Sequence, residues 1–216
     1  MVETLLSPKQ IIAARIAKEM KDGDVVNLGI GLPTLIPNYL PENCHVTLQS
    51  ENGYFGLGPL VGEGEPDLVD AGGKPSGILP GGAFFDSLMS FSFIRGGHID
   101  LAVLGGLEVD EQGNLANWMV PGKLVPGMGG AMDLVVGAKK VIVAMEHTSK
   151  NGDPKIVKRC KLPLTGEHVV DVIVTELAVF HMTEEGLVLV ELQEGVDLET
   201  VKQKTEASFK ISPAIL

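Results

Sequence analysis

Glu51 is the residue of this chain best placed for covalent chemistry. It follows Val46-Thr47-Leu48-Gln49, where apolar and polar residues alternate as in a half-buried strand, and it precedes the turn signal Asn52-Gly53. A carboxylate in a glycine-rich loop at the end of a strand can act as a nucleophile, and it can equally cap a turn. The local pattern taken alone favours the turn residue.

The segment Gly127-Met128-Gly129-Gly130 is a second candidate for chemistry. Consecutive small residues can turn their N–H groups toward one point and hold an oxyanion or a phosphate, whereas the alternative is a tight packing turn. The 27 glycines gather at residues 53–64, 72–82, 96–106 and 122–137, between candidate strands. This distribution predicts loops in which the backbone approaches a ligand closely.

Other catalytic and cofactor motifs are incomplete. Gly29-Ile30-Gly31 begins like a dinucleotide fingerprint, but Thr34 stands where the third glycine belongs. No phosphate-loop pattern is complete, and Ser50 lacks the flanking glycines of a hydrolase nucleophile elbow. The histidines do not have the spacing of a helical zinc site, so we expect no metal.

The elements that position these residues alternate along the chain. A capping box at Ser7, with Ile12, Ile16 and Met20 on one face, predicts a helix that ends at Gly23. A strand over residues 24–27 and a brief helix over 34–40 follow, and continuous apolar runs at 99–104 and 141–145 predict buried parallel strands. Residues 169–192 predict a β-rich C-terminal layer, and 197–206 predict a helix capped by Asp197.

These patterns predict one domain over residues 1–216, with an open, mostly parallel α/β sheet flanked by helices. The hydrophobic content of 44% argues against disorder, and the formal net charge of −11 argues against nonspecific binding to nucleic acid or anionic membranes. No apolar run reaches a membrane span, and the N-terminal segment does not resemble a signal peptide, so we expect a cytoplasmic protein. Cys44 and Cys160 are expected to be reduced thiols.

The chain resembles the B (β) subunit of class I CoA-transferases, in particular the 3-oxoacid group. That group includes succinyl-CoA:3-ketoacid and acetate or butyrate:acetoacetate CoA-transferases. The segments that carry the resemblance, in the family's order and spacing, are Gly29 to Pro33, Gln49 to Gly53, Ile94 to His98, Leu115 to Trp118, Pro121 to Lys123, Gly127 to Leu134, Met145 to His147 and Leu162 to Thr165.

The resemblance implies that Glu51 is a covalent nucleophile. Its carboxylate would attack an acyl-CoA to give an acyl-glutamyl anhydride, and the released CoA thiolate would then form a glutamyl-CoA thioester. Kinetics would be ping-pong, with CoA as a substrate and no metal or redox cofactor. A carboxylate is a weak nucleophile toward a thioester, so remote CoA contacts and oxyanion donors must assist it.

By similarity, Gly130 offers its backbone N–H to the oxyanion. Asn27 and the loop Gly29-Ile30-Gly31 lie along the CoA chain, and Asn52 and Gly129 are further candidates for binding the substrate or CoA. Lys74, one residue later than in the family's pattern, is the candidate for a CoA phosphate contact.

The family's α subunit carries a Gly-Gly-Phe-Gly-type loop that completes the site, and this chain has none. The resemblance therefore implies an α partner, an active site between the two chains, and an αβ or α2β2 assembly. Two other functions remain open, an acyl-CoA hydrolase that uses the same Glu51 and a non-catalytic small-molecule-binding module of related fold. The intact Ser50-Glu51-Asn52-Gly53 run argues against the module.

Overall fold

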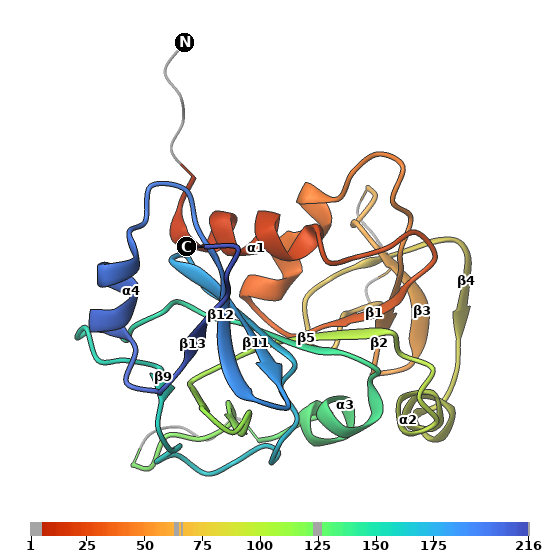
Figure 1. The fold of residues 1–216 in the computed structure, drawn as a ribbon. Coiled ribbons are helices and arrows are strands. Elements are labelled where there is room, and N and C mark those ends of the chain that lie inside the picture. Colours follow the sequence, from red (N-terminus) through yellow and green to blue (C-terminus); the bar gives the residue numbers. More distant parts are fainter. Residues whose placement is uncertain (1–5, 63–64, 66, 123–126, 216) are drawn as a thin grey trace.

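A ten-stranded sheet forms the centre of the computed structural model, which describes residues 6–62, 65, 67–122 and 127–215 (Figure 1). Lys123, part of one segment that carries the family resemblance, lies outside the described residues. The strand order is β13-β12-β11-β10-β8-β5-β1-β2-β3-β4. The strands are β1 Val25–Leu28, β2 Thr47–Ser50, β3 Tyr54–Gly58, β4 Gly77–Phe84, β5 Leu101–Gly105, β8 Val141–Ala144, β10 Val172–Val174, β11 Ala178–Thr183, β12 Gly186–Leu192 and β13 Lys210–Ile211.

The middle of this sheet is parallel, as the apolar runs predict. β2, β1, β5, β8 and β10 pair in parallel, while β3 and β4 on one side and β11 and β12 on the other pair antiparallel. The carboxyl ends of the five parallel strands therefore share one edge of the sheet. This is the edge at which open α/β sheets bind ligands.

Helices cover both faces of the parallel strands, and Figure 1 shows α1 on one side and α2 and α3 on the other. Along β5, Leu101 and Val103 pack in one core cluster, and Ala102 and Leu104 pack in the other. Because both faces of these strands are buried, their sequences are continuous apolar runs. The helices are α1 Pro8–Ala17, the 3-10 helix η1 Leu32–Tyr39, α2 Ser87–Arg95, α3 Ala131–Gly137 and α4 Leu198–Lys204.

The first helix is shorter than predicted. It starts at Pro8, where the Gln10 side chain accepts the Ser7 backbone N–H at 2.9 Å, but it ends at Ala17 with Lys18 as C-cap. Met20 is buried beyond the helix end, so its apolar side chain reaches the core from a turn. The four-residue spacing of Ile12, Ile16 and Met20 thus predicted correctly that Met20 is buried, but it did not predict where the helix ends.

The β-rich C-terminal segment is confirmed, and its strands extend the main sheet. A small second sheet of order β7-β6-β9 was not predicted; its strands are β6 Glu108–Asp110, β7 Leu115–Ala116 and β9 Ile156–Val157. Helices α2 and α3 were not predicted either. In the part of the chain that the structure describes, no helix is long and apolar enough to span a membrane.

Candidate active site

A cavity of about 1100 Å³ opens at the carboxyl ends of β1, β2 and β5. Gly29, Glu51 and Gly105 contribute to its wall from these three strand ends. Two loops complete the lining, with residues 70–72 on one and 127–131 on the other. The fold thus brings the glycine-rich segment at 127–130 and the candidate nucleophile to one space.

Glu51 lies in the tight turn that joins β2 to antiparallel β3. The Gly53 N–H donates to the Ser50 carbonyl at 3.0 Å. Gly53 has a φ of +133°, and a Cβ there would lie 2.5 Å from the Phe85 carbonyl oxygen, so this position requires glycine. The turn leaves the half-buried Glu51 on the cavity wall.

A buried hydrogen-bonded chain links the Glu51 backbone to the Glu51 carboxylate. The Ser90 hydroxyl donates to the Glu51 carbonyl at 2.7 Å, and Gln49 Nε2 donates to Ser90 Oγ at 3.1 Å. Gln49 Oε1 accepts from Asn27 Nδ2 at 2.5 Å, and the same Nδ2 donates to Glu51 Oε2 at 3.2 Å. Asn27, Gln49 and Ser90 are almost fully buried. We call these four residues the Glu51 cluster.

The donor and acceptor roles in this series of hydrogen bonds follow from the number of protons on each side chain. Ser90 has one hydroxyl proton and gives it to the Glu51 carbonyl, so its oxygen accepts from the Gln49 amide NH₂. The Gln49 carbonyl oxygen then faces Asn27, which must present its NH₂ group. Asn27 is thereby set to donate to the Glu51 carboxylate. Its own Oδ1 is buried and has no hydrogen-bond partner among the described residues.

Gly130 faces Glu51 from the start of α3. A Cβ at Gly130 would lie 3.1 Å from Glu51 Cγ and 3.5 Å from the Phe91 ring, so a larger residue would displace the Glu51 side chain. Gly129 has a φ of +54°, in the left-handed region. Within the described residues, neither Gly129 nor Gly130 donates its backbone N–H to an acceptor. As far as the described residues go, these N–H groups can stabilise negative charge that develops beside Glu51.

The model of the coenzyme A transferase family matches residues 9–204 of this chain. The chain belongs to this family. It is 62% identical over 207 residues to the beta chain of the acetate CoA-transferase of Escherichia coli K12, and the match covers 96% of this chain and 95% of that protein. It is 56% identical over 205 residues to the B subunit of the succinyl-CoA:3-ketoacid coenzyme A transferase of Helicobacter pylori 26695, covering 94% and 99%. This CoA-transferase chain thus corresponds to the β, or B, subunit of those enzymes.

A solved structure extends the comparison to the fold. The acyl-CoA transferase YdiF of Escherichia coli O157:H7 superposes with a TM-score of 0.78 at 25% identity. The match covers 99% of this chain and 44% of that one, so the CoA-transferase chain spans less than half of the YdiF polypeptide. The open α/β architecture predicted from the sequence is confirmed.

The predicted site residues of the CoA-transferase chain fall into two groups. Those that line the cavity are Gly29, Ile30, Glu51, Gly129 and Gly130. Asn27 is buried behind them and donates a hydrogen bond to the Glu51 carboxylate. Gly31, Asn52 and Lys74 are exposed and do not contribute to the described lining. The Asn52 amide donates to the Val69 carbonyl at 2.8 Å. Substrate contacts by these three residues stay predictions.

Sequence reasoning missed several residues that the fold brings to the site. Gln49 and Ser90 are 41 positions apart, so no local pattern could pair them. Asn117 and Trp118 were not named as candidate site residues, yet both line the cavity. The Asn117 amide donates to the Gly105 carbonyl at 3.0 Å and accepts from the Thr165 hydroxyl at 2.6 Å, which holds it at the cavity wall.

The charged residues of the lining are acidic. Among the described residues, the cavity has the carboxylates of Glu51 and Asp70 and the imidazole of His45, and neither lysine nor arginine contributes to its wall. The described part of the chain contains no cluster of three or more histidine, cysteine or acidic side chains that could hold a metal ion.

Proposed function

We propose that this chain is the β subunit of an enzyme that moves CoA between an acyl-CoA and a short-chain carboxylate or 3-oxoacid such as acetoacetate, through a glutamyl-CoA thioester on Glu51. The observation that carries the proposal is the placement of the Glu51 carboxylate against Gly130 on the wall of one cavity. A nucleophile and oxyanion donors that meet at one point are what acyl transfer requires. The names of the relatives, which specify acetate and 3-ketoacids, support the substrate class.

In the first half-reaction, a Glu51 carboxylate oxygen attacks the thioester carbonyl carbon. The tetrahedral oxyanion accepts hydrogen bonds from the Gly130 and Gly129 N–H groups, and the C–S bond breaks to release CoA thiolate and leave an acyl-glutamyl anhydride. The thiolate then attacks the glutamyl carbonyl carbon and expels the first acid. Asn27 Nδ2 holds Oε2 of Glu51, which leaves Oε1 for the attack.

The second half-reaction reverses these steps with a different acid. The acceptor carboxylate attacks the glutamyl thioester and releases the thiolate, and the thiolate attacks the acyl carbonyl of the new anhydride. The products are a new acyl-CoA and a regenerated Glu51 carboxylate. Every step exchanges one carboxylate or thiolate for another, so the sequence consumes no proton, metal or redox cofactor.

The proposal includes an α partner. Two observations support this partner. The relatives are named as β or B subunits, and the YdiF chain is more than twice as long as the region that this chain matches. The complete unit would be at least an αβ heterodimer, and α2β2 is the expected assembly because closed two-fold pairing is the commonest way for protomers to associate.

Reconstitution with the α partner tests this function. We expect the isolated chain to be inactive, and the mixture to transfer CoA only when an acceptor acid is present. Release of CoA without an acceptor would identify a hydrolase, and no gain from the partner would favour a non-catalytic module. Full transfer activity of the isolated chain would contradict the divided site.

A further inference from the structure

The two residues beside Glu51 are both hydrogen-bonded to one loop of the cavity wall. The Ser50 hydroxyl accepts the Ala71 backbone N–H at 3.0 Å, and the Asn52 amide donates to the Val69 carbonyl at 2.8 Å. Ser50 is almost fully buried, whereas Asn52 is exposed. The turn that carries the nucleophile is therefore fastened to this loop on both sides of Glu51.

The loop also has hydrogen bonds of its own, and we call residues 69–74 the Asp70 loop. Asp70 Oδ1 accepts the backbone N–H groups of Gly72 and Lys74 at 2.8 and 2.9 Å. The Asp70 N–H donates to the Lys74 carbonyl at 2.8 Å, and the Gly73 N–H donates to the Asp70 carbonyl at 2.9 Å. These bonds close a compact turn, so a hydrogen bond to one of its residues positions the whole loop.

The outer end of the Asp70 loop contacts the glycine-rich segment that follows β1. A Cβ at Gly72 would lie 3.2 Å from the Ile30 side chain, and both residues line the Glu51 cavity. Ile30 remains 65% exposed, so this contact buries little apolar surface. The Asp70 loop is therefore held mainly through its hydrogen bonds to Ser50 and Asn52.

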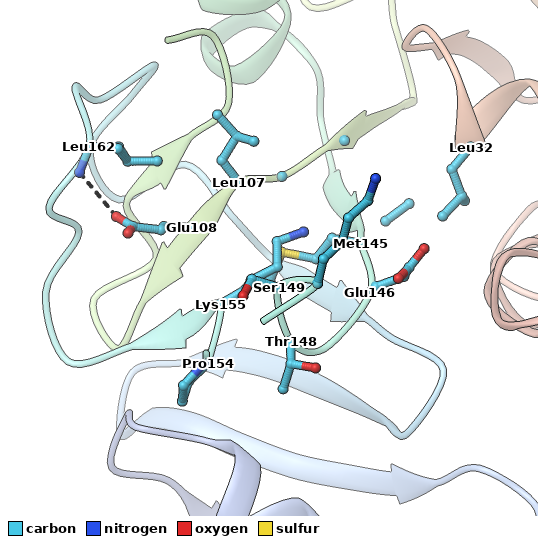
Figure 2. A pocket seen from close by; sticks show the side chains of 14 residues that line it. Leu32, Leu107, Glu108, Met145, Glu146, Thr148, Ser149, Pro154, Lys155 and Leu162 are labelled. Carbon is cyan, nitrogen blue, oxygen red and sulfur yellow. Dashed lines mark hydrogen bonds between the residues drawn. The ribbon is translucent and has the colours of Figure 1, made fainter. Parts of the chain in front are cut away.

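The loop at a neighbouring cavity is not attached in this way. This second cavity, of about 510 Å³, lies over the ends of β5 and β8, and its wall includes Ser149 and Pro154 (Figure 2). Its loop is closed by the Ser149 N–H, which donates to the Asp153 carbonyl at 2.8 Å, and by the Ser149 hydroxyl, which donates to the Asp153 carboxylate at 3.0 Å. Among the described residues, no hydrogen bond joins that loop to residues 50–52. Attachment to the turn of the nucleophile thus distinguishes the Asp70 loop.

This attachment has a consequence for catalysis. Residues 70–72 line the Glu51 cavity, so a substrate that fills the cavity contacts the Asp70 loop. Contacts remote from the reacting bond raise kcat only when they hold the substrate in the geometry of attack. We propose that Ser50 and Asn52 are positioning residues, which fix the Asp70 loop to the turn of Glu51 so that the contacts of CoA with this loop contribute to kcat. The assignment rests on the proposed function.

Asn52→Ala tests the proposal without disturbing the core. Asn52 is exposed and its φ is not positive, so alanine fits this backbone. In the αβ complex, kcat for acyl-CoA should fall by about tenfold, the factor expected for one hydrogen bond, while KM changes by less than about twofold. The same acyl thioester of N-acetylcysteamine, which lacks most of the CoA chain, should react equally well with both proteins.

Thr183→Ala is the matched control. The exposed Thr183 hydroxyl donates to the Gly186 carbonyl at 2.9 Å in the hairpin between β11 and β12, outside the described cavity lining. This variant should leave both substrates unaffected. Equal losses on the two thioesters with Asn52→Ala would mean that Asn52 supports only the turn of Glu51. No loss on either thioester would mean that the Asp70 loop needs no attachment, and each of these results would overturn the proposal.

Hydrogen exchange separates the Asp70 loop from the chemistry at Glu51. The αβ complex carrying Glu51→Gln is labelled in deuterated water, with and without CoA, alone and combined with Ser50→Ala or with Asn52→Ala. Without CoA, peptides that cover residues 69–74 should exchange about tenfold faster in both variants, because the loop has lost one hydrogen bond. CoA should slow this exchange in the complex that keeps Ser50 and Asn52.

Two results of this measurement would overturn the proposal, namely unchanged exchange of residues 69–74 in either variant and the absence of any effect of CoA on these residues. Failure of the proposed function has a different signature. In that case the Asp70 loop responds as expected, but the complex with an intact Glu51 transfers no CoA.

Discussion

Two buried polar clusters lie near the carboxyl ends of the parallel strands, and they differ in whether their hydrogen bonds are complete. In the Glu51 cluster, Asn27 Oδ1 has no partner among the described residues, and the Glu51 carboxylate borders a cavity. In the His147 cluster, defined as His147, Thr175 and Thr205, both ring nitrogens are paired and all three residues are buried. Buried polar groups are normally satisfied, so the incomplete cluster beside the cavity is the better candidate for a functional site, and the complete cluster supports the fold.

The largest effect in this comparison is expected from Glu51→Gln. The amide keeps the size of the side chain and an acceptor for Asn27, but it is not a nucleophile. Transfer should fall by at least about 10⁴-fold, the scale seen when other covalent catalysts are removed. Steady-state rates of the αβ complex measure this loss, and circular dichroism confirms the fold. Near-native transfer would contradict the role of Glu51.

Gly130→Ala should have the next largest effect. The added Cβ would meet Glu51 Cγ at 3.1 Å and shift the nucleophile from its donors. We expect kcat to fall by about 100-fold, because small misplacements of reacting groups cost about that much. Gly105→Ala is the matched control, since its Cβ meets nothing within 4 Å on the same cavity wall. Equal losses in the two variants would indicate cavity filling and not a displaced Glu51.

A smaller loss is expected from Ser90→Ala, which interrupts the Glu51 cluster. Without the hydroxyl, the Gln49 amide loses its acceptor and its orientation, so Asn27 no longer has to donate to Glu51. We expect kcat to fall by about tenfold and the unfolding free energy by about 1–3 kcal/mol. Ser92→Ala serves as control because the exposed Ser92 hydroxyl bonds only its own helix, at the Leu88 carbonyl. If kcat and the unfolding free energy change equally in both variants, the hydrogen bonds of the Glu51 cluster do not position Glu51.

The His147 cluster should make the free energy of unfolding depend on pH. Burial, with smaller contributions from Lys204 and Lys155, lowers the pKa of His147 from 6.5 to about 4. The unfolded chain therefore binds the extra proton first, and stability is full above pH 6.5 and is lost as the pH falls toward 4. The loss at pH 5 should be about 2 kcal/mol. Denaturant midpoints at pH 7 and 5 measure it, and His147→Gln should remove this part of the pH dependence. An unchanged dependence in the variant would assign it to other groups.

Sequence patterns predicted the parallel strands because burial on both faces produces continuous apolar runs, as at Leu101–Gly105 and Val141–Ala144. They failed for α2. Its residues Ser90-Phe91-Ser92-Phe93 alternate polar and apolar as a strand would. The helix signals stand at its two ends, with Asp86, whose side chain accepts the Met89 N–H at 2.9 Å, before it and Arg95-Gly96 at its end. Because α2 was not predicted, the position of Ser90 beside Glu51 was not predicted either.

The candidate site was predictable only in part for the same physical reason. Glu51 and Gly130 stand in glycine-rich loops that are visible in the sequence and that carry part of the resemblance on which the sequence analysis rests. The residues that orient Glu51 come from three separate elements, with Asn27 on β1, Gln49 on β2 and Ser90 on α2. Hydrogen bonds between distant positions leave no periodic pattern, so the structure was needed to find them.

The most direct test of the account is to trap the intermediate. The αβ complex is incubated with acyl-CoA and no acceptor acid, reduced with borohydride, digested and analysed by peptide mass spectrometry. The account predicts that the Glu51 carboxyl group is converted to the alcohol, because borohydride reduces a thioester and leaves free carboxylates intact. Reduction at another residue with Glu51 unmodified, or no acyl-CoA-dependent modification at all, would contradict it.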